Sequence, residues 1–210
     1  MIYLLWGAGA LVLLYLVRRF LGDHQQEKSR QYEIMEKRFR FDRRTFRSQW
    51  GKGMGSHFSL DGAYRGYPVR LYSHFAGEGK ERRLWTSVTY EALFAGEREF
   101  RLNGVKGDEC SRFGITDSLI SEGALGEYEL YSQGSGVGVA FWNDELLGRL
   151  EQLSAKGVGG SISLSKGFLE YRESGEMDTE EKRLHFQLVI VFLADVCDEL
   201  SLVAKSGIGG

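Results

Sequence analysis

The sequence contains few of the residues that mark several well-defined protein classes. Its 210 residues include 2 cysteines and 1 proline, which excludes a disulfide-dense secreted scaffold and a polyproline architecture. The net charge of −2 at pH 7 argues against a dedicated nucleic-acid-binding protein. A hydrophobic content of 42%, together with that low net charge, excludes a disordered chain. We therefore expect one globular domain with an appendage.

The appendage is an apolar run at the start of the sequence. Residues 2–17 carry no charged side chain, and Arg18 and Arg19 follow them. As a helix, residues 1–21 would be about 31 Å long, which matches the roughly 30 Å hydrocarbon core of a bilayer. A cleaved signal peptide and a buried core helix are the alternatives, but no basic residue precedes the run. We predict an uncleaved membrane anchor over residues 1–21, in which Gly7 and Gly9 leave room for a partner helix.

The uneven distribution of charge predicts how the anchor is oriented. Residues 18–47 carry 10 basic and 5 acidic side chains, whereas the rest of the chain carries 17 basic and 24 acidic ones. Positive charge next to a membrane helix favours the cytoplasmic side. We therefore predict a single-pass membrane protein with its N-terminus outside and its main domain in the cytoplasm.

Residues 22–50 are predicted to be a basic juxtamembrane connector, with a short helix around residues 25–38. The second half of this segment alternates basic and aromatic residues. Three interpretations fit it: Phe39 and Phe41 pack onto the domain while the bases stay solvated, the bases contact an anionic leaflet, or they contact RNA. We favour the first two and expect no nucleic-acid partner. The candidate membrane-surface residues are Arg18, Arg19, Lys37, Arg38, Arg40, Arg43, Arg44 and Arg47.

Residues 51–205 are predicted to form an α+β domain, followed by a short tail over residues 206–210. Alternating runs separated by glycine turns predict strands, at residues 57–64, 67–75, 82–93, 99–104, 127–133, 161–165 and 168–173. Asn143 can cap a helix that stops at Gly157, and a longer helix is predicted from Asp178 to Lys205. Because the connections are short, we expect an antiparallel sheet with two main helices packed on one face.

No motif in the sequence specifies catalysis, a cofactor or a metal. The glycine clusters at residues 51–55 and 134–139 lack the spacing of phosphate-binding loops. None of the four histidines has the spacing of a metal ligand. His57 and His74 lie in neighbouring predicted strands, where an ordinary cross-strand pair is expected. We therefore expect a non-enzymatic protein without cofactor or metal.

The function predicted from these features is that of a membrane-anchored cytoplasmic interaction domain. Such a domain would be an accessory or assembly subunit of a membrane complex and would bind both the membrane and a protein partner. Two alternatives remain open: a sensor of anionic lipid or of a small ligand, and a membrane-anchored hydrolase whose site is dispersed along the chain.

Overall fold

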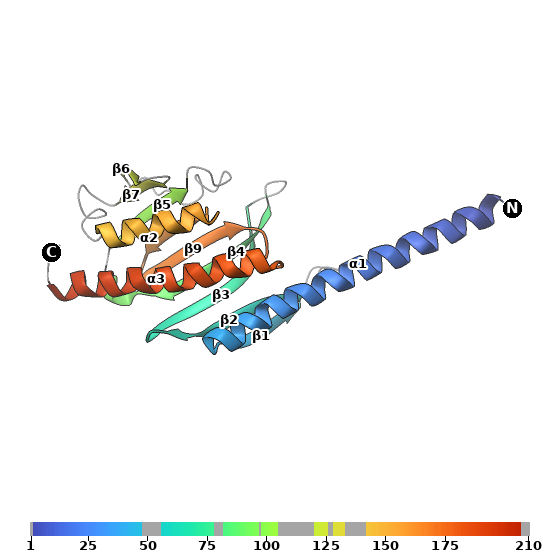
Figure 1. The fold of residues 1–210 in the computed structure, drawn as a ribbon, viewed down its shortest axis with the longest axis horizontal. Helices are drawn as coiled ribbons and strands as arrows, with labels where there is room; N and C mark the ends of the chain where they lie inside the picture. The colour runs from blue at the N-terminus through green and yellow to red at the C-terminus, as the bar shows by residue number, and fades with distance from the viewer. Residues whose placement is uncertain are drawn as a thin grey trace.

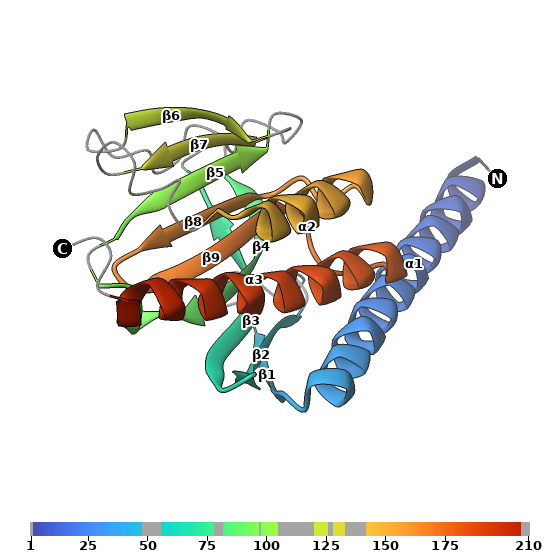
Figure 2. The ribbon, with the colours of Figure 1, turned by 60° about the vertical axis from the view of Figure 1, so that its left-hand side comes forward.

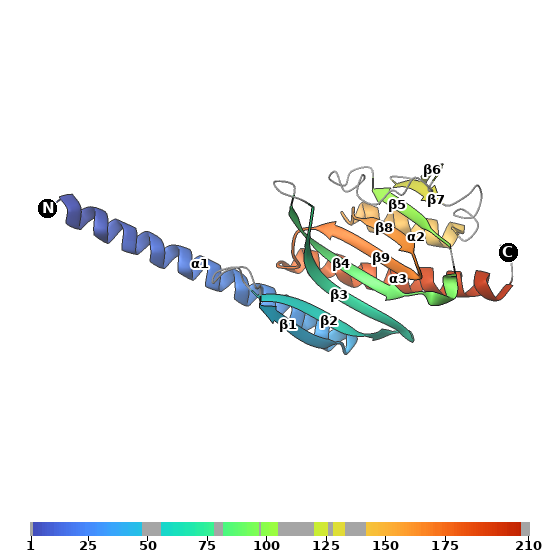
Figure 3. The same cartoon turned by 180° about the vertical axis from the view of Figure 1, so that it is seen from behind.

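The structure is a computed structural model that describes residues 2–47, 56–77, 82–96, 98–104, 120–125, 128–132 and 142–206. Within these ranges, three α-helices cover one face of an antiparallel sheet (Figure 1). They are α1 (Ile2–Phe39), α2 (Asp144–Ala155) and α3 (Glu180–Ser206). Seen from the opposite side, the sheet lies in front of the helices (Figure 3). The predicted α+β class and antiparallel sheet are confirmed, and the C-terminal part of α1 packs on the sheet in addition to the two helices that were expected there.

Nine strands of the described chain form one sheet in the order β1-β2-β3-β4-β9-β8-β5-β7-β6. Strands β1 to β4 follow one another as a meander. The hairpin of β9 and β8 is then inserted between β4 and β5, so the order of the strands in the sheet differs from their order in the chain. The strands are β1 (Asp42–Arg47), β2 (Ser56–Tyr64), β3 (Tyr67–Ala76), β4 (Arg83–Glu91), β5 (Phe100–Gly104), β6 (Ile120–Leu125), β7 (Tyr128–Ser132), β8 (Ser161–Ser165) and β9 (Phe168–Ser174).

The local signals for α2 are confirmed. The Asn143 side chain accepts a hydrogen bond from the Leu146 amide at 2.9 Å, as an N-cap does. At the other end, Gly157 has φ +80 and its amide donates to the Ser154 carbonyl at 2.9 Å. This left-handed residue ends the helix at the position where glycine is favoured. The stripe of Leu146, Leu150 and Leu153 is buried, because α2 packs against α3 and the sheet.

Helix α3 crosses the sheet at the centre of the helical layer. α2 lies on one side of it and α1 on the other (Figure 2). Its buried side chains include Val189, Ile190 and Leu193. The Tyr90 hydroxyl of β4 donates to the Ile190 carbonyl at 2.8 Å, which fixes the helix over the middle of the sheet.

Helix α1 is uninterrupted from Ile2 to Phe39, so it continues across the boundary expected near residue 21. Its N-terminal part projects from the domain (Figures 1 and 3), and its C-terminal part packs on β1, β2 and α3. The predicted anchor, residues 1–21, falls on a part of α1 whose side chains, apart from Tyr15 and Arg19, lie outside the described set.

Within the described part of the chain, no helix is both long and apolar enough to cross a membrane.

Two strands were not predicted. β1 has the sequence DRRTFR and was assigned to the basic connector. It pairs antiparallel with β2, and its arginines have carboxylate neighbours that the sequence alone does not show: Arg43 lies 3.3 Å from Glu36 and Arg44 lies 3.6 Å from Asp61. β6 pairs with β7 at the opposite edge of the sheet.

Gly160, just before β8, is expected to tolerate no side chain. A Cβ atom there would lie 2.4 Å from the Arg172 carbonyl oxygen and 2.5 Å from the Tyr171 ring. We predict that Gly160→Ala lowers the free energy of unfolding by about 1–3 kcal/mol, because an overpacked site must displace its neighbours. Gly159→Ala is the matched control, since nothing lies within 4 Å of its added Cβ. Denaturant unfolding would check both, and equal stability of the two variants would contradict the packing described.

Candidate interaction site at the α1 junction

A buried ion pair joins α1 to the segment between β9 and α3. The Lys28 ammonium donates to both carboxylate oxygens of Glu176 at 3.0 Å. The two side chains are only 3% and 13% exposed. The ammonium also lies 5.8 Å from the centre of the Phe58 ring, and His57 Nδ1 lies 3.6 Å from Glu176. A buried lysine is stable only with such a partner, because an unpaired buried charge is strongly destabilising.

One helical turn further along α1, Tyr32 connects to the sheet through a chain of hydroxyl groups. Its oxygen lies 3.0 Å from Ser73 Oγ, which lies 2.9 Å from Thr86 Oγ1. Thr86 then donates to the Gly175 carbonyl at 2.7 Å. Burial raises the pKa of the Tyr32 phenol, against the effect of the hydrogen bond with Ser73, and the carboxylate of Glu176 raises it further. The phenol therefore stays neutral and can act as a hydrogen-bond donor.

A second polar contact joins α1 to α3. Arg183 is buried, and its Nε donates to the Gln31 side-chain oxygen at 2.8 Å. The Gln31 amide donates in turn to Glu27, and Arg183 Nη2 donates to Glu180 at 3.0 Å. At the start of this interface His24 lies 3.7 Å from Asp178. Among the described side chains of α1, His24 is thus the first with a contact to the domain.

Aromatic side chains close the far end of the junction, where α1 turns into β1. The Phe39 and Phe41 rings stack at 5.3 Å, and Phe39 meets the Tyr64 ring edge-on at 5.4 Å. Phe41 is buried and fills the space over Gly62, where a Cβ atom would lie 2.4 Å from its ring. The interpretation in which Phe39 and Phe41 pack onto the domain is thus confirmed by the structure.

The predicted membrane-surface residues occupy different parts of the molecule. Arg19, Lys37, Arg38, Arg40 and Arg44 are exposed. Arg43 is half-buried and donates to the Ser29 carbonyl at 3.2 Å. The side chains of Arg18 and Arg47 lie outside the described set. The surroundings of the two predicted partner-helix glycines, Gly7 and Gly9, lie outside it as well.

The histidines expected to pair across two strands have separate surroundings. The His57 ring meets Phe75 edge-on at 5.7 Å, next to Glu176. The His74 ring lies 5.1 Å from that of Tyr72, and burial lowers its pKa. In the described residues, no group of three or more histidine, cysteine or acidic side chains is placed to hold a metal ion.

The two cysteines contribute no reactive thiol to the described part of the chain. Cys197 is buried in α3, and burial raises its pKa to about 12, with a smaller effect from Asp198. The thiol therefore stays protonated at neutral pH. Cys110 and the predicted glycine clusters lie outside the described residues.

A second polar cluster lies between α2 and α3, and it also binds residues at the turn that joins β2 to β3. Asp195 accepts hydrogen bonds from Arg149 and, at 2.5 Å, from Arg65. Asp198 accepts one from the Tyr67 hydroxyl at 2.8 Å. Arg149, Asp195 and Asp198 line a pocket of about 190 Å³, together with Glu145. Because the carboxylates of Asp195 and Asp198 already have partners, we assign the cluster a structural role.

The residues of the α1 junction were missed at the sequence level. Lys28 and Glu176 are 148 positions apart, and no motif links them. The available signal was the spacing of Lys28, Gln31, Tyr32 and Met35, which places four buried side chains on one helical face. With a lysine and a glutamine in it, this stripe resembles a solvated surface.

Comparison with known proteins shows similarity of fold. No protein-family model matches the sequence, and no curated protein matches it. Among solved structures, the chain is similar to the crystal structure of the mycobacterial trehalose monomycolate transport factor A, with a TM-score of 0.56 and 12% sequence identity. The match covers 87% of this chain and 95% of the other. At this identity the similarity shows the fold alone.

We predict that Lys28→Met lowers the free energy of unfolding by about 3 kcal/mol, because it leaves the Glu176 carboxylate buried without its cation. Replacing both partners, in Lys28→Met with Glu176→Leu, should recover most of that loss. Glu33→Gln is the control, since it breaks the exposed pair with Lys37 on the same helix and should leave stability unchanged. Thermal unfolding of the full chain in detergent, followed by circular dichroism, would measure all three. A Lys28→Met chain as stable as the natural one would contradict the assigned role of the pair.

Proposed function

We propose that this protein is a single-pass membrane protein whose cytoplasmic α+β domain is a non-catalytic accessory or assembly subunit of a membrane complex. One observation carries the proposal. The helix that begins in the predicted anchor continues without a break to Phe39, and the buried Lys28–Glu176 pair fastens its second half to the domain. An anchor followed by a flexible linker would only tether the domain, whereas this arrangement would hold the domain in one orientation at the membrane.

The position of the junction supports a place close to the bilayer. Among the described side chains of α1, the first to contact the domain is His24, five residues after Arg19. At a rise of 1.5 Å per residue, this is about 8 Å along the helix axis. With Arg18 and Arg19 at the cytoplasmic headgroups, the domain would start immediately below the membrane surface. A protein partner within the same membrane would then meet a defined face of the domain.

The chemistry of the junction supports a non-catalytic role. Its ionisable and hydroxyl groups are engaged with one another: Lys28 with Glu176, and Tyr32 with Ser73 and Thr86. The protein of similar fold is described as a transport factor. We extend to this chain only the broad idea of an accessory role in a membrane-associated process.

The proposal predicts that binding of a partner depends on the rotational phase of α1. Two alanines inserted after Gly22 would turn the domain by about 200° about the helix axis relative to the anchor. Seven alanines would return it to within about 20° of its original orientation. We expect the natural chain to recover a stoichiometric membrane partner from detergent extracts of native membranes, the two-alanine chain to lose that partner, and the seven-alanine chain to regain it.

Two controls accompany this experiment. All three chains should stay in the membrane fraction after an alkaline carbonate wash, and a reporter fused after Gly210 should report a cytoplasmic position. Equal recovery of the partner by all three chains would contradict a fixed orientation. A natural chain that purifies alone would contradict the role of interaction subunit.

A further inference from the structure

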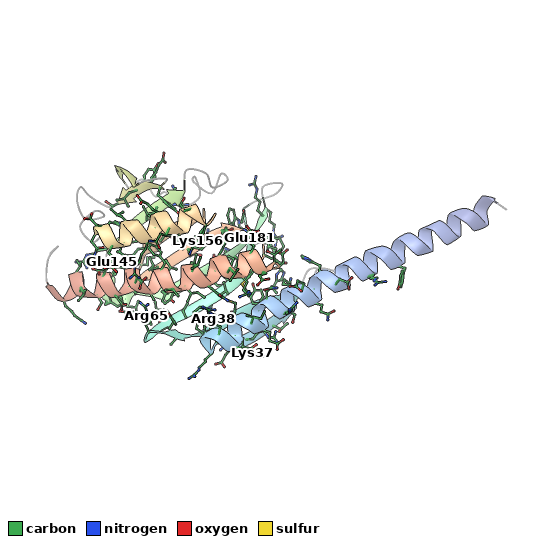
Figure 4. The ribbon with its side chains drawn as sticks, in the orientation of Figure 1. Lys37, Arg38, Arg65, Glu145, Lys156 and Glu181 are labelled. Atoms are coloured by element: carbon green, nitrogen blue, oxygen red, sulfur yellow. The ribbon has the colours of Figure 1, made fainter. Side chains whose placement is uncertain are left out.

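The candidate membrane-surface residues lie in two separate parts of the structure. Arg18 and Arg19 lie near the middle of α1. Lys37 and Arg38 lie at the end of the helix remote from the N-terminus (Figure 4). Arg18 and Lys37 are 19 residues apart in one uninterrupted helix. This separation corresponds to about 28 Å along the axis.

If the proposed anchor spans the membrane, Lys37 and Arg38 lie too far from the leaflet to be attracted by its charge. Arg18 and Arg19 would then lie at the headgroups. Even a helix tilt of about 40° would leave roughly 22 Å between the leaflet and Lys37. At physiological ionic strength, electrostatic attraction is screened over about 8 Å. An anionic leaflet therefore does not explain a concentration of basic side chains at this end of α1.

Arg40 adds an observation from the backbone. It follows the last residue of α1 and has φ +58. Glycine is the favoured residue at this position after a helix, because a side chain is strained in the left-handed conformation. An arginine here carries a conformational cost, and strained residues that persist tend to have a function.

The two other non-glycine residues with positive φ provide a comparison. Arg65 and Lys166 each have φ +52 and precede a glycine in a hairpin turn. Arg65 contributes to the fold, because it binds Asp195 at 2.5 Å and Asp198 at 3.3 Å. Arg40 is exposed, and within the described part of the chain it forms no ion pair. The strain at Arg40 is thus not offset by an internal contact of the kind that Arg65 makes.

Two of the three acidic residues around this corner are bound to other bases, and the third, Asp42, is exposed. Glu33 binds Lys37 at 2.6 Å, and Glu36 lies 3.3 Å from Arg43. Residues 33–44 contain five basic and three acidic side chains. Arg38, two positions before Arg40, is also exposed and has no ion-pair partner within the described residues. Two guanidinium groups therefore remain available at the corner.

We propose that Arg38 and Arg40 form a docking surface for an acidic segment of a partner protein, on the side of the domain that faces away from the membrane. A guanidinium group binds a carboxylate through two parallel hydrogen bonds, which gives such a surface geometric selectivity as well as attraction. This inference names the partner chemistry for the proposed interaction role. An anionic membrane and a nucleic acid are the alternatives that the test must exclude.

The first experiment uses the full chain in detergent and a fluorescent peptide of alternating glutamate and serine. We expect Arg38→Glu to weaken peptide binding by about tenfold and Arg40→Gly by about fivefold, as for loss of charge-assisted hydrogen bonds. Arg40→Gly should also raise the Tm by about 1–3 °C, because glycine relieves the backbone strain. A gain in stability together with a loss of binding cannot result from misfolding.

Lys166→Gly is the matched control, since it also replaces a basic residue of positive φ by glycine. It should raise the Tm in the same way and leave peptide binding unchanged. Equal peptide affinity of the natural chain, Arg38→Glu and Arg40→Gly would overturn the inference. A single-stranded RNA that binds the natural chain more tightly than the peptide, and that Arg40→Gly weakens, would overturn it in favour of nucleic acid.

The second experiment separates this inference from the proposed function. The full chain is reconstituted in phosphatidylcholine vesicles with and without phosphatidylglycerol at about one lipid in three. Peptide binding should be the same in both, whereas competition by the anionic lipid would show that the corner faces the leaflet and would overturn the inference. A chain that fails to insert into either vesicle would instead contradict the anchor, and the detergent result would still decide the partner chemistry.

Discussion

The ion pair between Lys28 and Glu176 is the contact on which the attachment of α1 depends. A buried ammonium requires a carboxylate at close range, and Glu176 supplies both of its oxygens at 3.0 Å. Sliding α1 by one turn would move Lys28 by about 5.4 Å and leave both charges unpaired. The pair therefore sets the register of the helix as well as its attachment. Tyr32 and Gln31 reinforce the same register, because each also has one partner in the domain.

The topology of the sheet explains how Glu176 reaches α1. β9 is inserted beside β4, and Trp85 pairs with Ser174 at the end of that ladder. The Gly175 amide then donates to the Leu84 carbonyl at 2.8 Å, so the chain is still held to β4 just before Glu176. A simple meander would have placed β5 in this position. The insertion of the β8–β9 hairpin beside β4 is thus what brings a carboxylate from the second half of the chain to a lysine near its start.

The sequence predicted the elements whose causes are local. The Asn143 cap, the helix end at Gly157 and the strands at residues 161–165 and 168–173 each depend on residues within a few positions of one another, and the structure confirms them. Phe39 and Phe41 were assigned to the domain in one of the three interpretations, since two aromatic rings next to a predicted sheet favour burial.

The α1 junction could not be predicted, because its interacting residues are far apart in the sequence. Lys28 resembles a solvated helix residue until Glu176 is placed beside it, and Arg43 resembles a membrane-facing base until Glu36 and the Ser29 carbonyl are seen nearby. Such partners are distant in sequence or lie across a turn, and no periodicity reveals them. β1 was not predicted either, because its charged sequence was assigned to the basic connector.

The most direct test of the account is the distance between the projecting part of α1 and the domain. Spin labels would be placed at Tyr15 and Glu181, both exposed, in a full chain whose cysteines are replaced by alanine. In lipid vesicles, pulsed electron paramagnetic resonance should give one narrow distance distribution, and Lys28→Met should broaden it. A broad distribution in the chain that retains Lys28 would contradict the claim that one continuous helix holds the domain in a fixed orientation.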